Sequence, residues 1–188
     1  MSEGRSRPAR SDWGWHALRP VWAERVVAAS PVRLGDLVLD LGAGDGALTW
    51  PLLAMGARVV AVELHERRLD SLRSGLDELA RDDPRVRDRL TLLPRDLRDL
   101  WLPGRPFRVV ASPPYALTAA TVRLLMTTDR LRSADLLLQR GAALGWCERG
   151  LKGPYARRYR LGLGPRVPRS AFTPPPRFDT VVLQIRRR

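Results

Sequence analysis

The 188-residue chain has few of the residues that build disulfide frameworks or metal centres. Its one cysteine, Cys147, excludes an internal disulfide, and one cysteine with two histidines is a poor ligand supply for zinc, so we expect no metal. No uninterrupted apolar run approaches the ~20 residues that span a bilayer, and the N-terminus lacks the apolar stretch of a secretory signal. The sequence therefore predicts a cytoplasmic protein with no membrane partner.

Acidic residues are scarce near the C-terminus. Residues 140–188 contain twelve Lys or Arg against two Asp or Glu, so this segment carries +10 of the net charge of +13. The C-terminal segment is strongly basic, whereas the rest of the chain has nearly equal numbers of acidic and basic residues. This distribution indicates a polyanionic partner, because guanidinium groups bind phosphate through two donors at once. A solvated basic surface with no partner fits the same composition.

Apolar runs alternate with amphipathic stretches along most of the chain. Seven runs have the length and composition of strands: 37–41, 58–63, 90–93, 107–111, 134–138, 158–163 and 180–185. Helices are expected at 21–29, 47–55, 66–81 and 117–127. This alternation predicts an α/β fold with a mostly parallel seven-stranded sheet, in which the last two strands form an antiparallel edge. Residues 1–12 are expected to be a flexible basic arm, and residues 13–188 a single domain.

A glycine-rich turn, D-L-G-A-G-D-G at residues 40–46, connects the first strand of this sheet to the helix after it. Gly42 and Gly44 let the backbone turn sharply and approach a ligand. The preceding Asp40 and the G-x-G-x-G spacing depart from the dinucleotide pattern and favour a cofactor without phosphate, such as S-adenosylmethionine. Glu63 and Asp96 end the next strands, where they can meet a ribose and an adenine edge. Each acid alone could be a helix cap, but their order on successive strand ends favours a nucleoside cofactor.

A second rigid loop, Ser112-Pro-Pro-Tyr115, follows the fourth strand. Pro113 and its neighbour fix the backbone, so that the Ser112 hydroxyl and a carbonyl point into the cleft while Tyr115 offers a flat face. Methylation of an exocyclic base amine needs such acceptors and an aromatic platform for the extruded base. A structural Pro-Pro turn with a packed tyrosine is the alternative.

Together, V-L-D-L-G-A-G-D-G-A-L-T, Glu63, Asp96, the S-P-P-Y loop and A-F-T-P-P-P-R-F-D at 171–179 resemble the ribosomal RNA adenine N6-methyltransferases. This family includes the Erm macrolide-resistance enzymes and the small-subunit adenine dimethylases. The resemblance implies a Rossmann-like class I methyltransferase fold and S-adenosylmethionine as cofactor. It also implies that Tyr115 and Phe172, the latter from the family's F-x-P-x-P-x-V-D segment, hold the target base. The specific expectation is N6 methylation of an adenine in large-subunit RNA, which gives macrolide-type resistance.

The sequence departs from the family's pattern at two loops and at its end. Ser112 replaces an asparagine, and Ser-Pro-Pro-Tyr is also the form found in cytosine N4-methyltransferases. The family's G-Q-N-F-L segment is G-W-H-A-L here, with His16 where an asparagine helps to bind the cofactor. The family usually continues into a C-terminal helical domain, whereas this chain stops after the last strand.

Without that helical domain, we expect RNA contacts from the N-terminal arm and from basic residues of the C-terminal segment. The arginines predicted to make them are Arg140, Arg157, Arg158, Arg160 and Arg177. The expected partner is ribosomal RNA, free or in a precursor particle, and the expected state is a monomer. Two alternatives remain: methylation of a cytosine amine or a small molecule, and a non-catalytic RNA-binding or assembly protein on the same fold.

Overall fold

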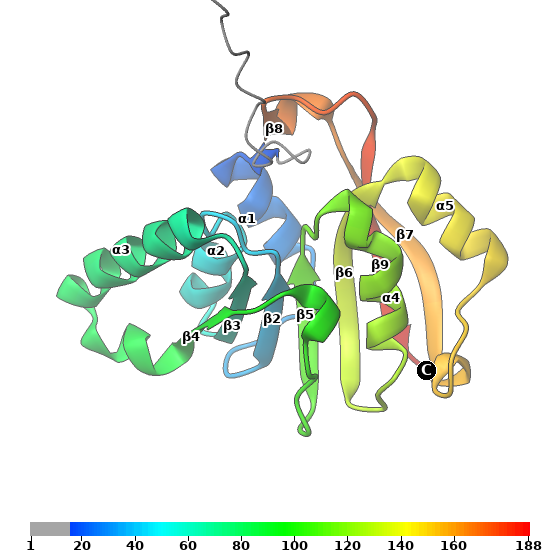
Figure 1. Ribbon diagram of the computed structural model, residues 1–188, viewed down its shortest axis with the longest axis horizontal. Coiled ribbons are helices and arrows are strands. Elements are labelled where there is room, and N and C mark those ends of the chain that lie inside the picture. Colours follow the sequence, from blue (N-terminus) through cyan, green and yellow to red (C-terminus); the bar gives the residue numbers. More distant parts are fainter. Residues whose placement is uncertain (1–15) are drawn as a thin grey trace, which may run out of the picture.

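The computed structural model describes residues 16–188, and one seven-stranded sheet runs through its centre (Figure 1). The strand order is β4-β3-β2-β5-β6-β9-β7. These strands are β2 (Leu37–Leu41), β3 (Arg58–Glu63), β4 (Leu90–Pro94), β5 (Phe107–Ala111), β6 (Leu131–Gln139), β7 (Tyr159–Val167) and β9 (Thr180–Arg187). The first five are parallel, and β9 runs antiparallel to both β6 and β7. The mostly parallel sheet with an antiparallel edge is therefore confirmed. The predicted arm at 1–12 lies outside the described residues.

Helices cover both faces of this sheet. They are α1 (Pro20–Ala28), α2 (Thr49–Ala54), α3 (Glu66–Asp82), α4 (Thr118–Leu125) and α5 (Arg140–Arg149). One core cluster joins buried side chains of α1, α2 and α3 to Val38 of β2, and the other joins α4 and α5 to Leu39. Because adjacent strand residues point to opposite faces, a strand buried on both sides is largely apolar, and Asp40 is the exception in β2. None of the helices in 16–188 has the length and apolar character needed to cross a membrane.

Helix α5 is the α-helix of 16–188 that the sequence did not reveal. Its sequence, R-G-A-A-L-G-W-C-E-R, contains Gly141 and Gly145, and each glycine lowers helix propensity by about 1 kcal/mol relative to alanine. The helix forms because tertiary packing outweighs this preference: Ala143 is fully buried in the core. In addition, the Arg140 N–H donates a 2.8 Å hydrogen bond to the Asp179 carbonyl.

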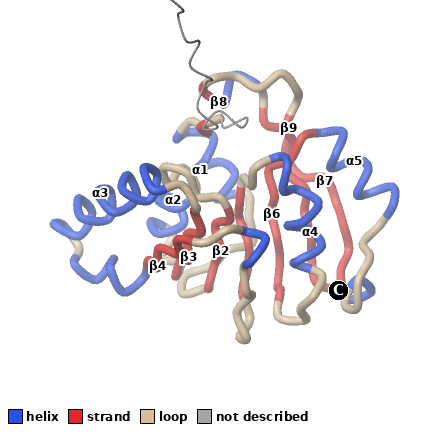
Figure 2. The backbone as a smooth tube through the Cα atoms, in the orientation of Figure 1, coloured by secondary structure: helices blue, strands red, loops and turns tan. Residues whose placement is uncertain are grey.

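A separate two-stranded ribbon lies above the carboxyl ends of the parallel strands (Figure 2). It pairs β1 (Ala17–Leu18) with β8 (Phe172–Thr173) in antiparallel register, so that Leu18 lies opposite Phe172. The ribbon ties the N-terminal segment to the connection between β7 and β9. With two residues per strand, neither half has a periodicity that sequence analysis can detect.

Candidate active site

The side chains singled out in the sequence converge at the carboxyl ends of β2, β3, β4 and β5. The sheet order reverses between β2 and β5, because β3 and β4 continue to one side of this pair and β6 to the other. Open α/β sheets bind ligands at such a switch point. A cleft of about 1090 Å³ opens there, which is slightly larger than the roughly 300–1000 Å³ usual for ligand pockets. It has room for a nucleoside and a second group together.

The glycine-rich turn and the Ser112–Tyr115 loop touch each other in this cleft. Gly42 and Gly44 both have positive φ, 78° and 59°. The N–H of Gly42 donates to the Val62 carbonyl at 2.8 Å, which fixes the turn to β3. A Cβ on Gly42 would lie 3.0 Å from Pro114 Cδ, so glycine is needed there for space as well as for conformation. The two loops that sequence analysis assigned to cofactor and substrate are thus neighbours.

Glu63 organises the cofactor side of the cleft and is 6% exposed. Its Oε2 accepts a 2.8 Å hydrogen bond from the Gly44 N–H. Its Oε1 accepts from the Leu64 and His65 N–H groups at 2.9 and 2.8 Å. A carboxylate has about four lone-pair positions, so one position on Oε2 remains for a ligand hydroxyl. Glu63 therefore holds the glycine-rich turn in place and still offers an acceptor to a ribose.

Asp40 lies deeper, at 1% exposure, and lines the same cleft. Burial raises the pKa of this carboxyl to about 7, although the Thr49 hydroxyl, which donates to Oδ2 at 2.8 Å, opposes the rise. The nearby charge of Glu63 adds to the increase. A buried carboxyl with such a pKa is well matched to a cationic group of a ligand, which would favour its ionised form.

Asp96 is placed at the far end of the cleft, where β4 ends. It caps the short 3₁₀ turn Leu97–Asp99, and its Oδ1 accepts from the Arg98 N–H at 2.8 Å. Hydrogen bonds from Arg98 lower the pKa of Asp96 to about 2, so the carboxylate is ionised at neutral pH. The helix-cap role and the position in the cleft, which the sequence left as alternatives, are both present.

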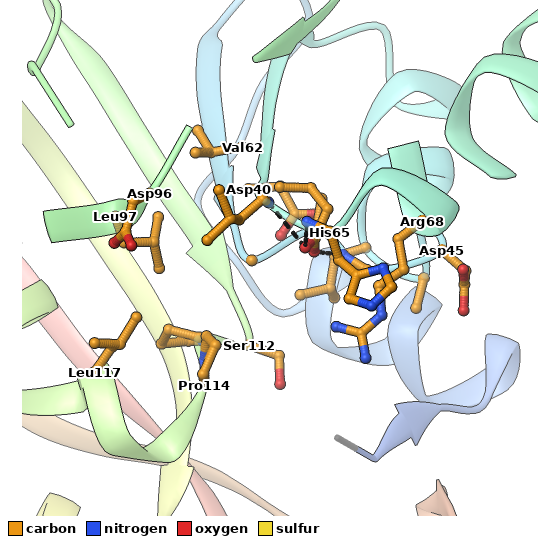
Figure 3. A pocket seen from close by; sticks show the side chains of 18 of the residues that line it. Asp40, Asp45, Val62, His65, Arg68, Asp96, Leu97, Ser112, Pro114 and Leu117 are labelled. Atoms are coloured by element: carbon orange, nitrogen blue, oxygen red, sulfur yellow. Dashed lines mark hydrogen bonds between the residues drawn. The ribbon is translucent and has the colours of Figure 1, made fainter. Parts of the chain in front are cut away.

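Sequence reasoning missed several residues of the cleft wall. Leu64, which follows Glu63 and is 61% exposed, offers an apolar surface to the cleft beside that carboxylate. Figure 3 shows His65 and Arg68 on one side of the cleft and Ser112 and Pro114 on the other. The sequence signal for Leu64 is an apolar residue directly after a strand-end acid. Sequence analysis could have identified it by this position. No three His, Cys, Asp or Glu side chains in 16–188 lie close enough together to hold a metal ion.

An aromatic cluster lies at the Ser112–Tyr115 loop. The rings of Tyr115 and Phe178 meet edge to face with centroids 4.6 Å apart. His16 lies 6.2 Å from Tyr115 and 6.3 Å from Phe178, and its Nδ1 is 2.7 Å from the carbonyl oxygen of Pro174, a hydrogen-bond distance. Burial raises the pKa of the Tyr115 hydroxyl, which keeps it neutral. His16 also lines the cleft, together with Tyr115.

Phe172 is not part of this cluster and does not line the cleft, so the expectation that it holds the target base together with Tyr115 is corrected. Its ring is 1% exposed and belongs to the core cluster beneath α1. The physical reason is the β1–β8 ribbon, which sets Phe172 opposite Leu18 and so turns it inward. Phe178, six residues later and at the valine position of the family's segment, is the aromatic residue that contacts Tyr115.

The arginines predicted to bind RNA lie at two opposite edges of the sheet. Arg140 follows β6 and Arg177 precedes β9, so both are at the carboxyl edge with the cleft. Arg157, Arg158 and Arg160 surround the start of β7, which the antiparallel pairing through β9 places at the amino edge. An ion pair of 3.2 Å from Arg158 to Asp129, just before β6, marks that edge. These three arginines do not line the cleft.

The fold and the cleft have the architecture of a class I methyltransferase. The features that define it are the sheet order, the contact of the glycine-rich turn with the Ser112–Tyr115 loop, and the strand-end acids. A model of the ribosomal RNA adenine dimethylase family matches residues 10–158, and the chain belongs to this family. Members of the family are methyltransferases that use S-adenosylmethionine.

Individual relatives agree with this assignment. The rRNA adenine N-6-methyltransferase of Bacillus licheniformis is 26% identical over 88% of this chain and 57% of its own length. The ribosomal RNA small subunit methyltransferase A of Thermosynechococcus vestitus is 34% identical over 95% of this chain and 69% of its own. The 23S rRNA methyltransferase ErmE has the same fold, with a TM-score of 0.74 at 23% identity, covering 91% of this chain and 69% of that one. The chain spans little more than half the length of the first of these relatives.

Proposed function

We propose that the chain transfers a methyl group from S-adenosylmethionine to the N6 amine of an adenine in ribosomal RNA. The observation that carries this proposal is the direct contact of the two loops in one cleft, with Gly42 against Pro114. A donor held by the first loop and a base amine held by the second are brought to adjoining positions. Such positioning accounts for much of the rate of a transfer whose donor is already activated.

The residues present fit this cofactor, which supplies the methyl group when it is bound. The remaining lone pair of Glu63 can accept a ribose hydroxyl, and the buried carboxyl of Asp40 can pair with the cationic amino group. The open backbone at Gly42 and Gly44 leaves space for the cofactor. The exposed side chain of Leu64 offers an apolar surface to the adenine ring.

On the substrate side, Tyr115 and Phe178 supply the aromatic surface. The lone pair of an exocyclic amine is delocalised into the ring, so the amine attacks poorly until acceptors hold its hydrogens. The Ser112 hydroxyl can act as one acceptor, and the proline-fixed backbone carbonyl beside it as another. Stacking of the extruded base on Tyr115 holds the amine toward the donor. Because Phe178 contacts Tyr115 edge to face, the base must displace this ring or stack beside it.

The finer proposal is an adenine of the large-subunit RNA, with macrolide-type resistance as the outcome. It is supported by the resemblance of the motifs to the Erm enzymes, and relatives named rRNA adenine N-6-methyltransferase support the adenine N6 position. Ser112 in place of asparagine supports a second candidate, in which the amine belongs to a cytosine. The two differ in the methylated nucleoside that they produce.

Methyl transfer to whole ribosomal RNA from labelled S-adenosylmethionine, followed by nucleoside mass spectrometry, tests this proposal. We expect N6-methylated adenosine, mapped to a single region of the large-subunit RNA. Methylated cytidine would establish the second candidate, and methylation of the small-subunit RNA would refute the finer proposal. No transfer to any RNA, with cofactor binding intact, would indicate a binding protein.

Substitution of Tyr115 tests the substrate side separately. Tyr115→Ala removes a stacking contact worth about 1–3 kcal/mol, so kcat/KM should fall between roughly fivefold and 150-fold while the cofactor Kd stays within twofold. Tyr115→Phe, the matched control, keeps the ring and should retain most activity. An equal loss of cofactor affinity in Tyr115→Ala would instead mean that the ring has a structural role.

A further inference from the structure

A dense group of cations lies at the amino edge of the sheet, opposite the cleft. Residues 129–132, 152–160 and 187–188, which we term the amino-edge surface, contain eight Lys or Arg and one acid, Asp129. All eight cationic residues are exposed. This surface holds much of the positive charge that the sequence places near the C-terminus, and the cleft does not use it.

The sheet topology brings these three segments together. Strand β6 begins at this edge, and β9 ends there, because Ser133 pairs with Arg186. Strand β7 begins there, because Tyr159 pairs with Arg187. Figure 2 shows the loops that enter β6 and β7 beside the C-terminus, at the end of the sheet away from the β1–β8 ribbon.

Most of this charge has no counterion among residues 16–188. Asp129 is shared by Arg130 at 3.3 Å and Arg158 at 3.2 Å. In the part of the chain that the structure describes, the side chains of Arg132, Arg157 and Arg160 make no hydrogen bond or ion pair. Arg160 lies directly opposite Arg186 in the β7–β9 register, but Arg186 is paired with Asp135 at 2.6 Å, which leaves Arg160 as the cation without a partner among the described residues.

We propose that the amino-edge surface binds the phosphate backbone of a second segment of the same RNA that enters the cleft. This inference rests on the proposed function, because it takes ribosomal RNA as the substrate. Arginine suits phosphate through its planar fork of donors. The aromatic residues in these ranges, Tyr155 and Tyr159, are not exposed, which favours backbone contact over base recognition.

The two contacts must come from separate parts of the RNA. Strand β6 has nine residues, and at about 3.3 Å per residue the two edges are roughly 27 Å apart. A short stem–loop whose target nucleotide enters the cleft therefore does not reach the amino-edge surface, whereas a large folded RNA does.

The test compares two double variants that remove the same charge. Arg157→Gln with Arg160→Gln removes two unpaired cations of the amino-edge surface. Arg81→Gln with Arg123→Gln removes two exposed cations of α3 and α4 and serves as the control. Each protein is titrated with whole ribosomal RNA and with a short stem–loop carrying the methylated nucleotide, between 50 and 200 mM salt.

We expect the amino-edge variant to lose roughly tenfold in affinity for whole ribosomal RNA. The slope of log K against log salt should fall by about 1.5, because each lost phosphate contact removes about 0.7–0.9. Its binding to the stem–loop, and methylation of the stem–loop, should stay within twofold of the wild type. The control variant should retain the wild-type slope on both RNAs.

Three outcomes would overturn the inference: unchanged affinity for whole RNA, an equal loss in the control variant, or an equal loss on the stem–loop. Self-association of the wild type that the amino-edge variant abolishes, with RNA affinity unchanged, would assign the surface to a protein contact. Failure of the proposed function would look different. The wild type would then methylate neither RNA, and the affinities for whole RNA would still decide what the surface binds.

Discussion

Replacement of Asp40 by asparagine should change how both folding and cofactor binding depend on pH. The Asp40 pKa rises from an ordinary 3.8 to about 7 because the carboxyl is buried. Below pH 3.8 the group is protonated in the folded and unfolded chains alike. Between 3.8 and about 7 only the folded chain keeps the proton, so stability falls as pH rises and levels off above 7. At about 1.4 kcal/mol per pH unit, the full loss is on the order of 4 kcal/mol.

Asp40→Asn cannot ionise, so this part of the pH dependence should disappear. Urea unfolding of both proteins between pH 4 and 8 measures the difference between their free energies of unfolding. As pH rises, the free energy of unfolding of Asp40→Asn should increase by up to about 4 kcal/mol relative to that of the wild type. Most of this increase should occur below pH 7. Glu63, His65 and Arg68 line the same cleft and are present in both proteins, so the comparison isolates Asp40.

A cationic ligand beside Asp40 favours the ionised form, so cofactor binding should release a proton below pH 7. Calorimetry of S-adenosylmethionine binding at pH 6, in two buffers of different ionisation enthalpy, counts this proton. We expect close to one for the wild type and none for Asp40→Asn. The reasoning is refuted if the two stability curves are parallel and neither protein releases a proton.

Three further substitutions separate the roles of the glycine-rich turn and Glu63. Glu63→Gln leaves backbone N–H groups facing an amide, so the cofactor Kd should rise by roughly 10–100-fold. Calorimetry measures this Kd, and an unchanged value would exclude Glu63 from the cofactor site. Gly42→Ala and Gly35→Ala, at φ of 78° and 80°, should each cost about 1–2 kcal/mol in thermal unfolding. Only Gly42→Ala should also weaken cofactor binding, because its Cβ meets Pro114 whereas that of Gly35 meets nothing within 4 Å.

The fold and the cofactor side of the site were largely predictable from sequence. Strands buried on both faces are largely apolar, so β2, β3 and β5 stand out as nearly continuous apolar runs. Parallel strands end at one edge, so residues that follow them in sequence converge in space. Asp40, Glu63 and Asp96 were identified in this way, and all three line the cleft.

Local sequence does not encode which of two nearby aromatic residues faces the cleft. Phe172 and Phe178 lie on one connection, and the motif indicated Phe172. The β1–β8 pairing decides otherwise, since it sets Phe172 opposite Leu18, a residue far away in the chain. Helix α5 was missed for a related reason, because its glycines weaken the local signal while packing against β6, β7 and β9 supplies the stability.

The arginines show the same limit at the scale of the whole sheet. The number of arginines near the C-terminus can be counted in the sequence. The edge of the sheet at which each one lies depends on β9 being between β6 and β7. Because β9 is antiparallel to both neighbours, β7 begins at the amino edge, and residues 157–160 are carried away from the cleft. A charge count treats these arginines and Arg177 as one basic tail. The strand order separates them, with Arg140 and Arg177 at the edge of the sheet that holds the cleft and residues 157–160 at the opposite edge.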